Sequence, residues 1–173
     1  MSNGVLIAGI GNLFLTDDGF GSEVARRLAG KTLPPDVKVV DYGIRGMHLA
    51  YDLLDGYDAL IVVDALPGKG SPGELSVLEV GEDDLGAGDF DAHGMAPVAV
   101  LASLGQLGGT LPPTYVVGCQ PQDVSDGMGL TPAVSASVDG AVALVEELLA
   151  DPLWRTRASS TAGSTARSRE DLP

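Results

Sequence analysis

The sequence has a single cysteine, Cys119, in 173 residues. One thiol cannot form a disulfide within the chain, and one cysteine in a chain of this size is typical of a reducing compartment. The N-terminus carries no basic stretch, and the apolar run after it is interrupted at Gly9, Gly11 and Asn12, which argues against a secretory signal. We therefore expect a cytoplasmic protein.

Basic residues are also scarce, and no uncharged apolar run approaches the roughly 18 residues of a membrane-spanning helix. The chain has 10 Lys and Arg against 24 Asp and Glu, a formal charge of −14 at pH 7. Nucleic-acid binding depends on clustered basic side chains that neutralise phosphates. We expect neither a nucleic-acid nor a membrane partner, and cations or basic partners are favoured.

Apolar side chains are plentiful, because 45% of the residues are hydrophobic. That is enough to build a core, so the chain is not intrinsically disordered despite its charge. We predict one folded domain over residues 1–150. Residues 151–173 are rich in Ser, Thr, Ala and Arg and predict a disordered tail. The tail has four Arg and three acidic residues, so the body, with 6 basic and 21 acidic residues, carries a net charge of −15.

Four short apolar or β-branched runs predict strands, at residues 5–9, 37–40, 59–63 and 114–118. The first and third runs are apolar on both faces, which is typical of strands buried in a parallel sheet. Residues 75–79, which follow a Ser-Pro-Gly turn, predict one more strand, for which an antiparallel edge position is one possibility.

Stretches with apolar residues three and four apart predict helices at residues 19–28, 47–54 and 95–107. A last helix is expected to begin with Thr131 as its N-cap and Pro132 at its first position. Its apolar stripe consists of Val134, Val138, Ala141, Val142, Val145, Leu148 and Leu149.

Strands that alternate with helices predict an α/β fold, a three-layer α/β/α sandwich around a mostly parallel twisted sheet of about five strands. Two successive right-handed crossovers usually produce the order 2-1-3, so the first and third strands become neighbours at the topological switch point. Ligands in such sheets bind at the carboxyl ends of the strands beside that point. The polar residues that follow these two strands are therefore the first candidates for chemistry.

The loop after the first strand has glycines at Gly9 and Gly11, which is suggestive of a dinucleotide fingerprint. The third glycine of that pattern would fall at Phe14, where a bulky side chain would obstruct helix packing, so we reject it. Asp17 and Asp18 precede the next helix, where one acid is explained as a helix cap that complements the dipole. The second carboxylate lies over the switch point, and we predict that Asp18 is functional.

The third strand ends in Asp64 after four consecutive apolar residues, 60–63. A carboxylate in such a position must be hydrogen-bonded, paired or bound to a metal. Capping the loop at residues 65–68 is the structural alternative. We favour a functional role because the strand order brings Asp64 and Asp18 into one crevice. Two close carboxylates repel each other unless a proton or a cation lies between them.

Two histidines could supply a third ligand to a cation. His93 lies in a glycine-flanked loop before a helix and can reach the same edge of the sheet. His48 lies inside a predicted helix and is interpreted as an ordinary helix residue. Two carboxylates and one imidazole suit a first-row ion such as nickel or zinc, and three ligands leave open the positions that metal-assisted hydrolysis needs.

Cys119 with His93 is an alternative pair, a thiol nucleophile and its base. A small residue at a strand end is more often explained by packing. The sequence contains no Gly-x-Ser-x-Gly, no His-Glu-x-x-His and no phosphate-binding Gly-x-x-x-x-Gly-Lys motif, which removes several common enzyme classes.

The motifs over residues 4–150 together resemble those of the hydrogenase maturation endopeptidases, which trim the C-terminal extension of the large subunit of nickel-iron hydrogenases. The matching segments are residues 9–12 and 17–21, residues 41–46, residues 62–65, His93, and residues 129–132. The resemblance implies that Asp18, Asp64 and His93 are the metal ligands and the catalytic residues. It also implies that the metal is nickel, that the nickel arrives with the substrate, and that the partner is the precursor of a hydrogenase large subunit.

The sequence departs from the family pattern at two places. Some members have Glu where this chain has Asp18, which is shorter by one methylene. The family often has Thr after the glycine of the 41–46 loop, where Ile44 and Arg45 follow here. This second difference bears on substrate contact.

Two other functions are compatible with part of the pattern. A receiver-like signalling domain also has acids after its first strand and an Asp at the end of its third. Here, however, the acids come eight and nine residues beyond Gly9, and no lysine follows the last strand, at residues 118–121. A non-catalytic chaperone for the nickel-loaded precursor is the other alternative, and it would tolerate loss of His93.

Overall fold

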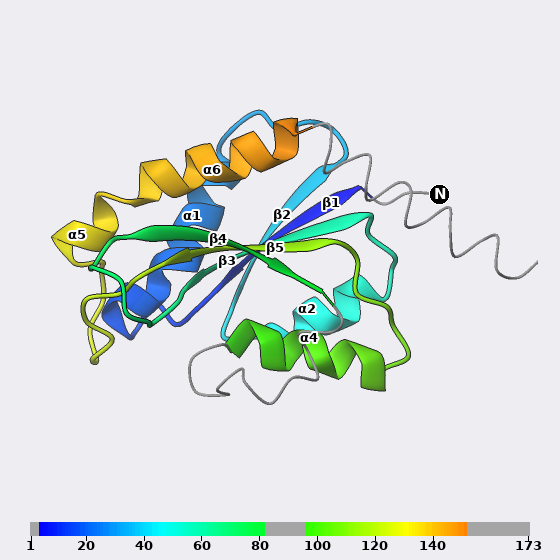
Figure 1. Ribbon diagram of the computed structural model, residues 1–173, viewed down its shortest axis with the longest axis horizontal. Coiled ribbons are helices and arrows are strands. Elements are labelled where there is room, and N and C mark those ends of the chain that lie inside the picture. Colours follow the sequence, from blue (N-terminus) through cyan, green and yellow to red (C-terminus); the bar gives the residue numbers. More distant parts are fainter. Residues whose placement is uncertain (1–3, 82–95, 152–173) are drawn as a thin grey trace, which may run out of the picture.

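The computed structural model describes residues 4–81 and 96–151. Its five strands form one twisted sheet with the order β2-β1-β3-β5-β4 (Figure 1). The strands are β1 (Val5–Ile10), β2 (Val37–Gly43), β3 (Ala59–Ala65), β4 (Leu75–Val80) and β5 (Thr114–Cys119). β1, β2, β3 and β5 pair in parallel, and β4 pairs antiparallel with β5 at one edge. The expected 2-1-3 order and the antiparallel edge strand are both confirmed.

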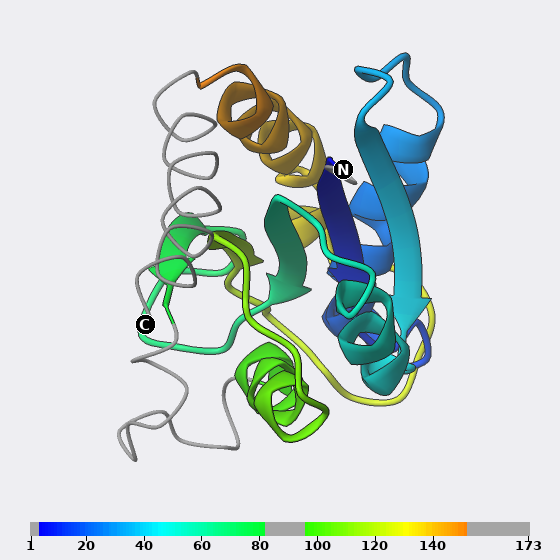
Figure 2. The same cartoon turned by 90° about the vertical axis from the view of Figure 1, so that its right-hand side faces the viewer.

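Helices cover both faces of the sheet, as the view in Figure 2 shows. α1 (Phe20–Ala29), the short α5 (Pro132–Ser135) and α6 (Val138–Ala150) cover one face, and α2 (Gly46–Leu53) and α4 (Ala96–Gln106) cover the other. The three-layer sandwich is therefore confirmed. Within the residues that the structure describes, no helix combines the length and apolar character needed to cross a membrane.

The core has two parts, one on each face of the sheet, because successive side chains of a strand point to opposite faces. Ile7 and Ile61 pack toward α1 and α6, whereas Leu6 and Leu60 pack toward α2 and α4. β1 and β3 are buried along their whole length. The two apolar runs of the sequence are thus the central strands.

Helix α1 approaches the sheet unusually closely at Gly21. A Cβ atom on Gly21 would lie 2.2 Å from the carbonyl oxygen of Val63 and 2.3 Å from that of Ile10. One on Gly9 would lie 2.5 Å from the carbonyl oxygen of Gly21. These contacts leave no room for any side chain, so Gly9 and Gly21 provide the close packing of helix on strand.

The expected single C-terminal helix is wrong, because the chain forms α5 and α6 with a break at Ser137. The N–H of Ser137 bonds to the carbonyl of Val134, three residues back, and the Ser137 hydroxyl donates to the carbonyl of Gly73. The tighter turn and the side-chain bond interrupt the regular helix. The predicted apolar stripe is nevertheless buried from Val134 to Leu149, except for Leu148, which is partly buried.

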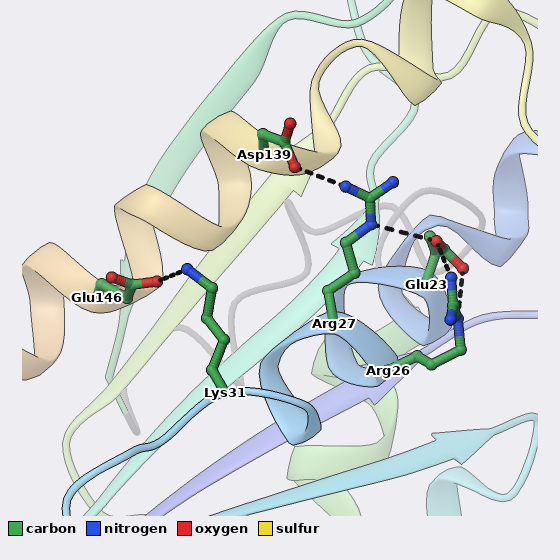
Figure 3. A network of polar contacts seen from close by, with 6 residues as sticks. All are labelled: Glu23, Arg26, Arg27, Lys31, Asp139 and Glu146. Atoms are coloured by element: carbon green, nitrogen blue, oxygen red, sulfur yellow. Dashed lines mark hydrogen bonds and ion pairs between the residues drawn. The ribbon is translucent and has the colours of Figure 1, made fainter.

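The outer surface around α1 and α6 carries a connected set of ion pairs through Arg27 and a separate pair, Lys31 with Glu146, drawn in Figure 3. The residues are Glu23, Arg26, Arg27, Lys31, Asp139 and Glu146. Arg27 joins the two helices through Asp139 at 2.6 Å, and the Asp139 side chain is 87% exposed. Such exposed pairs are screened by water and typically stabilise by less than about 1 kcal/mol.

Two expectations fall on residues outside the described part of the chain. His93 lies in the segment 82–95, and the expected disordered tail lies almost wholly in residues 152–173. The division into a domain over residues 1–150 and a tail stays a prediction.

Candidate active site

Asp64 is the penultimate residue of β3 and lies opposite Gly118 on β5. Its side chain is buried, with a residue exposure of only 4%. Burial raises the pKa of this carboxyl well above its usual range, the negative charge of Asp18 raises it further, and a hydrogen bond from the backbone of Ala65 opposes both effects. The expected convergence of Asp64 and Asp18 is thus present in the structure.

Asp18 lies in the 3-10 turn Thr16–Gly19 that precedes α1, and it is half-buried. Its Oδ2 atom accepts a hydrogen bond of 3.0 Å from the backbone N–H of Asn12. Gly11 makes this arrangement possible: it has a φ of +145°, and a Cβ atom on it would lie 1.9 Å from the Asp18 carbonyl oxygen and 3.8 Å from Oδ1 of Asp64. Gly11 therefore lies against the backbone of Asp18 and close to the carboxylate of Asp64.

The interpretation of Asp17 as a helix cap is wrong, because the structure gives α1 no side-chain cap. The Asp17 carboxylate is fully buried and accepts backbone hydrogen bonds from Gln122, Asp123 and Thr131 at 2.9, 3.0 and 2.7 Å. Burial alone would raise the pKa of Asp17, but these bonds and the one from the Thr131 hydroxyl lower it below its usual range. Asp17 thus holds the loop after β5 against the turn that carries Asp18.

Thr131 is the N-cap residue of α5 and Pro132 is its first residue, as expected, but the Thr131 side chain makes no capping hydrogen bond. Its hydroxyl donates instead to both oxygens of Asp17, at 3.0 Å and 2.8 Å. The hydroxyl is directed toward the buried carboxylate and not toward the first N–H groups of the helix, because a hydrogen bond to a charged acceptor is the stronger one.

A pocket of about 290 Å³ lies between the turn after β1 and the turn after β2, and it is lined by Asn12, whose backbone N–H binds Asp18. Its lining also includes Gly11 and Asp41. Oδ1 of Asp41 accepts hydrogen bonds from the hydroxyl of Ser22 at 2.7 Å and from the backbone N–H of Gly43 at 3.0 Å. The sequence contained a signal for this acid, because Asp41 begins one of the family-like segments. Its contact with Ser22 on α1 could be found only from the structure.

The next residue, Tyr42, is buried and donates a hydrogen bond of 2.6 Å from its hydroxyl to Oδ2 of Asp52. Burial and this carboxylate raise the pKa of Tyr42 above its usual range. The phenol therefore stays protonated and anchors the turn after β2 on helix α2.

Of the two histidines, only His48 lies among the described residues. It is exposed on α2, as the sequence indicated. In residues 4–81 and 96–151 there is no group of three or more His, Cys, Asp and Glu side chains arranged to hold a metal ion. Asp18 and Asp64 supply two candidate ligands, and His93, the third, lies outside the described part.

Cys119 ends β5 and is fully buried. Burial raises the pKa of its thiol to about 11, the negative charge of Asp17 also raises it, and a hydrogen bond with Ser137 opposes the shift. A nucleophilic cysteine needs an accessible thiolate. The structure therefore supports a packing role for Cys119 and argues against the thiol alternative.

The model of the family described as hydrogenase maturation protease matches residues 22–148, which is most of the chain. This chain belongs to the hydrogenase maturation protease family. The matched segment contains Asp64 and His93 and begins four residues after Asp18.

Relatives with known names support the same assignment. The hydrogenase expression/formation protein HupD of Rhodobacter capsulatus is 35% identical over 153 residues, which cover 84% of this chain and 71% of the relative. The hydrogenase 2 maturation protease of Escherichia coli (strain K12) is 32% identical over 149 residues, covering 84% of this chain and 88% of the relative.

Solved structures of family members have the same fold. The hydrogenase maturating endopeptidase HybD from Escherichia coli superimposes with a TM-score of 0.71 at 30% identity, covering 84% of this chain and 91% of that one. The maturation protease HycI from Thermococcus kodakarensis has a TM-score of 0.70 at 25% identity, covering 86% and 94%. The chain is thus a hydrolase of the hydrogenase maturation type on an α/β fold.

Proposed function

We propose that this protein removes the C-terminal extension from the nickel-loaded precursor of a nickel-iron hydrogenase large subunit, in the cytoplasm. Family membership supports the reaction class. The observation that carries the proposal is the pair of Asp18 and Asp64 at the carboxyl ends of β1 and β3, next to a pocket between the turns after β1 and β2.

The nickel ion is part of the substrate, carried by the precursor. Asp18 and Asp64 would be two of the protein ligands that hold it, and His93 the third. Their oxygen and nitrogen donors fit a borderline first-row ion, and a nearby cation would remove the repulsion between the two carboxylates. A bound cation of this kind polarises a carbonyl or activates a water molecule.

The protein's own contribution is positioning. The turn held by Asn12 fixes the carboxylate of Asp18, and β3 fixes that of Asp64. A scissile peptide held in the pocket beside Asp41 would lie next to both acids. Without a cation, Asp64 retains a proton to higher pH than an ordinary carboxyl. A chemical alternative at the same pair is therefore the mechanism of aspartic proteases, in which one carboxyl acts as the acid and the other carboxylate as the base.

The test is to mix the purified protein with the nickel-loaded and the nickel-free precursor of a hydrogenase large subunit and to weigh the products by mass spectrometry. We expect loss of the C-terminal extension from the loaded precursor alone. Equal cleavage of both forms would contradict the role of nickel, and tight binding without cleavage would favour the chaperone alternative.

The receiver-like alternative gains no support from the site. The family match favours a hydrolase over a signalling domain, and no lysine follows the last strand at residues 118–121. Incubation with a small phosphodonor should therefore leave the mass of the protein unchanged.

A further inference from the structure

The strand β2 lies at an edge of the sheet, where it pairs only with β1 (Figure 2). The N–H of Val5 donates to the carbonyl of Asp36, and Val5 lies opposite Val37 in the parallel register. In a parallel ladder, alternate residues direct both backbone groups to the same neighbour. Lys38 and Val40 therefore bond to β1, and the backbone groups of Val39 and Asp41 face outward.

Two observations agree with this orientation. The N–H of Val37, which is in phase with Val39, donates to the carbonyl of Pro34 and not to β1. Within the described residues, no backbone partner from another element joins the outer edge of β2 at Val39 or Asp41. The outer edge thus presents the N–H and carbonyl of Val39 in extended geometry and the N–H of Asp41, which lies directly before a shift in the register of β1 and β2.

Two adjoining hollows, which together we call the groove, lie beside this edge and reach Asn12, whose N–H binds Asp18. The first part of the groove, about 210 Å³, lies over α1 and β2 and is lined by residues that include Ala25, Ala29 and Val39. Its second part is the pocket of about 290 Å³ that contains Gly11 and Asn12. The two parts share Leu13, Ser22 and Asp41, so they adjoin each other along the same side of β2.

Large apolar side chains are exposed around the groove. Leu13 is 47% exposed, Phe14 67% and Ile44 78%. All three line the second part of the groove. Exposed apolar side chains clustered at a groove are typical of a surface that another chain covers.

We propose that the C-terminal segment of the precursor binds as an added strand along the outer edge of β2, with its scissile bond delivered to Asp18 and Asp64. This inference rests on the proposed function and names how that substrate is held. An extended peptide would pair with the backbone of Val39 and Asp41, and alternate side chains would enter the groove over α1. Leu13, Phe14 and Ile44 would contact its apolar side chains nearest the cleavage point.

The occupant is an extended peptide because the edge supplies main-chain donors and acceptors at strand spacing, and because the groove reaches Asn12, whose N–H binds Asp18. A second copy of this chain seated on β2 would block the candidate active site. Self-association along β2 would therefore appear as inhibition at high protein concentration.

A proline at position 39 tests the pairing, because it removes one outward N–H and none of the bonds that β2 makes to β1. We expect Val39→Pro to lower kcat/KM on the nickel-loaded precursor by at least about fivefold, mainly through KM, because one backbone hydrogen bond is lost. Val39→Ala is the matched control, since it removes side-chain contacts but keeps the N–H.

Hydrogen exchange on the wild-type protein is the second measurement, and it needs no variant to fold. The amides of Val39 and Asp41 should exchange quickly in the free protein and at least about tenfold more slowly with the precursor bound, whereas those of Lys38 and Val40 should be slow throughout.

If the wild-type protein cleaves the precursor while the amides of Val39 and Asp41 stay unprotected, the precursor binds elsewhere and this inference is wrong although the proposed function stands. Equal kcat/KM for Val39→Pro and Val39→Ala would overturn it in the same way. If the wild-type protein cleaves no precursor, the proposed function itself fails, and the docking of a substrate strand fails with it.

Discussion

The carboxylate of Asp17 receives two hydrogen bonds from Thr131, one from its backbone N–H at 2.7 Å and one from its hydroxyl. Together with the backbone bonds from Gln122 and Asp123, they join the turn after β1 to the loop after β5. Asp18 follows directly in the chain. Asp17 therefore holds the edge of the sheet together, and its neighbour Asp18 is close enough to Asp64 to raise the pKa of that carboxyl.

Replacing Asp17 by Ala would leave three backbone N–H groups without their acceptor in a buried place. We expect the free energy of unfolding to fall by about 3 kcal/mol or more, because each unsatisfied buried donor is costly. Asp139→Ala is the control, since it removes a carboxylate that is 87% exposed. It should cost less than about 1 kcal/mol. Urea unfolding of the two variants and the wild type measures both values, and similar losses for both would contradict the role of Asp17.

The stabilisation from Asp17 should also depend on pH. Its folded pKa is lowered, so the carboxylate stabilises the folded state above the ordinary pKa of about 4 and loses this effect as the pH falls through the lower folded pKa. The melting temperature of the wild type should therefore drop more steeply below pH 4 than that of Asp17→Ala. Parallel curves would contradict this prediction.

Asp64 should have the opposite effect on stability. Its folded pKa is raised, so between about pH 4 and that folded pKa the folded state binds more protons than the unfolded state. Stability then falls as the pH rises. Asp64→Asn removes this dependence, and we expect it to be more stable than the wild type at pH 7 while losing activity.

Thermal melting from pH 4 to pH 8 measures this difference. The advantage of the Asn variant should grow with pH and should shrink when Asp18 is also replaced by Asn, because the Asp18 charge contributes to the raised pKa of Asp64. An Asp64→Asn variant that is less stable than the wild type at every pH would contradict the claim that the buried charge of Asp64 destabilises the folded state.

Gly21 should tolerate no side chain. A Cβ atom there would overlap the carbonyl oxygens of Val63 and Ile10, which are rigid backbone atoms of the sheet. We expect Gly21→Ala to lower the melting temperature by more than about 10 °C or to prevent folding. Gly105→Ala in α4 is the matched control, because nothing lies within 4 Å of its Cβ position. It should be neutral or stabilise the protein by up to about 1 kcal/mol.

Cys119 should be inert and dispensable for catalysis. The thiol is buried and its pKa is raised to about 11, so little thiolate forms at pH 7 to 8. Iodoacetamide should not modify the folded protein over an hour, and Cys119→Ala should keep cleavage within about twofold of the wild type. Rapid alkylation with loss of activity would revive the thiol nucleophile.

The fold was largely readable from the sequence because each strand is a short apolar run. The runs at residues 5–9 and 59–63 became the fully buried strands β1 and β3. The break between α5 and α6 was not readable, because it depends on a bond from Ser137 to Gly73, 64 residues away. The spacing of apolar residues predicts which face of a helix is buried, but it does not predict hydrogen bonds between distant parts of the chain.

The candidate site was readable in part. The predicted 2-1-3 strand order makes β1 and β3 neighbours. Asp18 comes after β1 and Asp64 lies at the end of β3, so their proximity could be predicted. The roles of Asp17 and Asp41 were not readable, because their partners are backbone groups and a hydroxyl on other elements. Whether His93 completes the site stays a prediction.

The most direct test of the central claim is cleavage of a nickel-loaded hydrogenase large-subunit precursor by the wild type and by single variants, followed by mass spectrometry. Asp18→Ala, Asp64→Ala and His93→Ala should each lower cleavage by at least about a hundredfold, whereas Asp139→Ala should cleave like the wild type. Full activity of Asp64→Ala, or cleavage that does not depend on nickel in the precursor, would contradict the account.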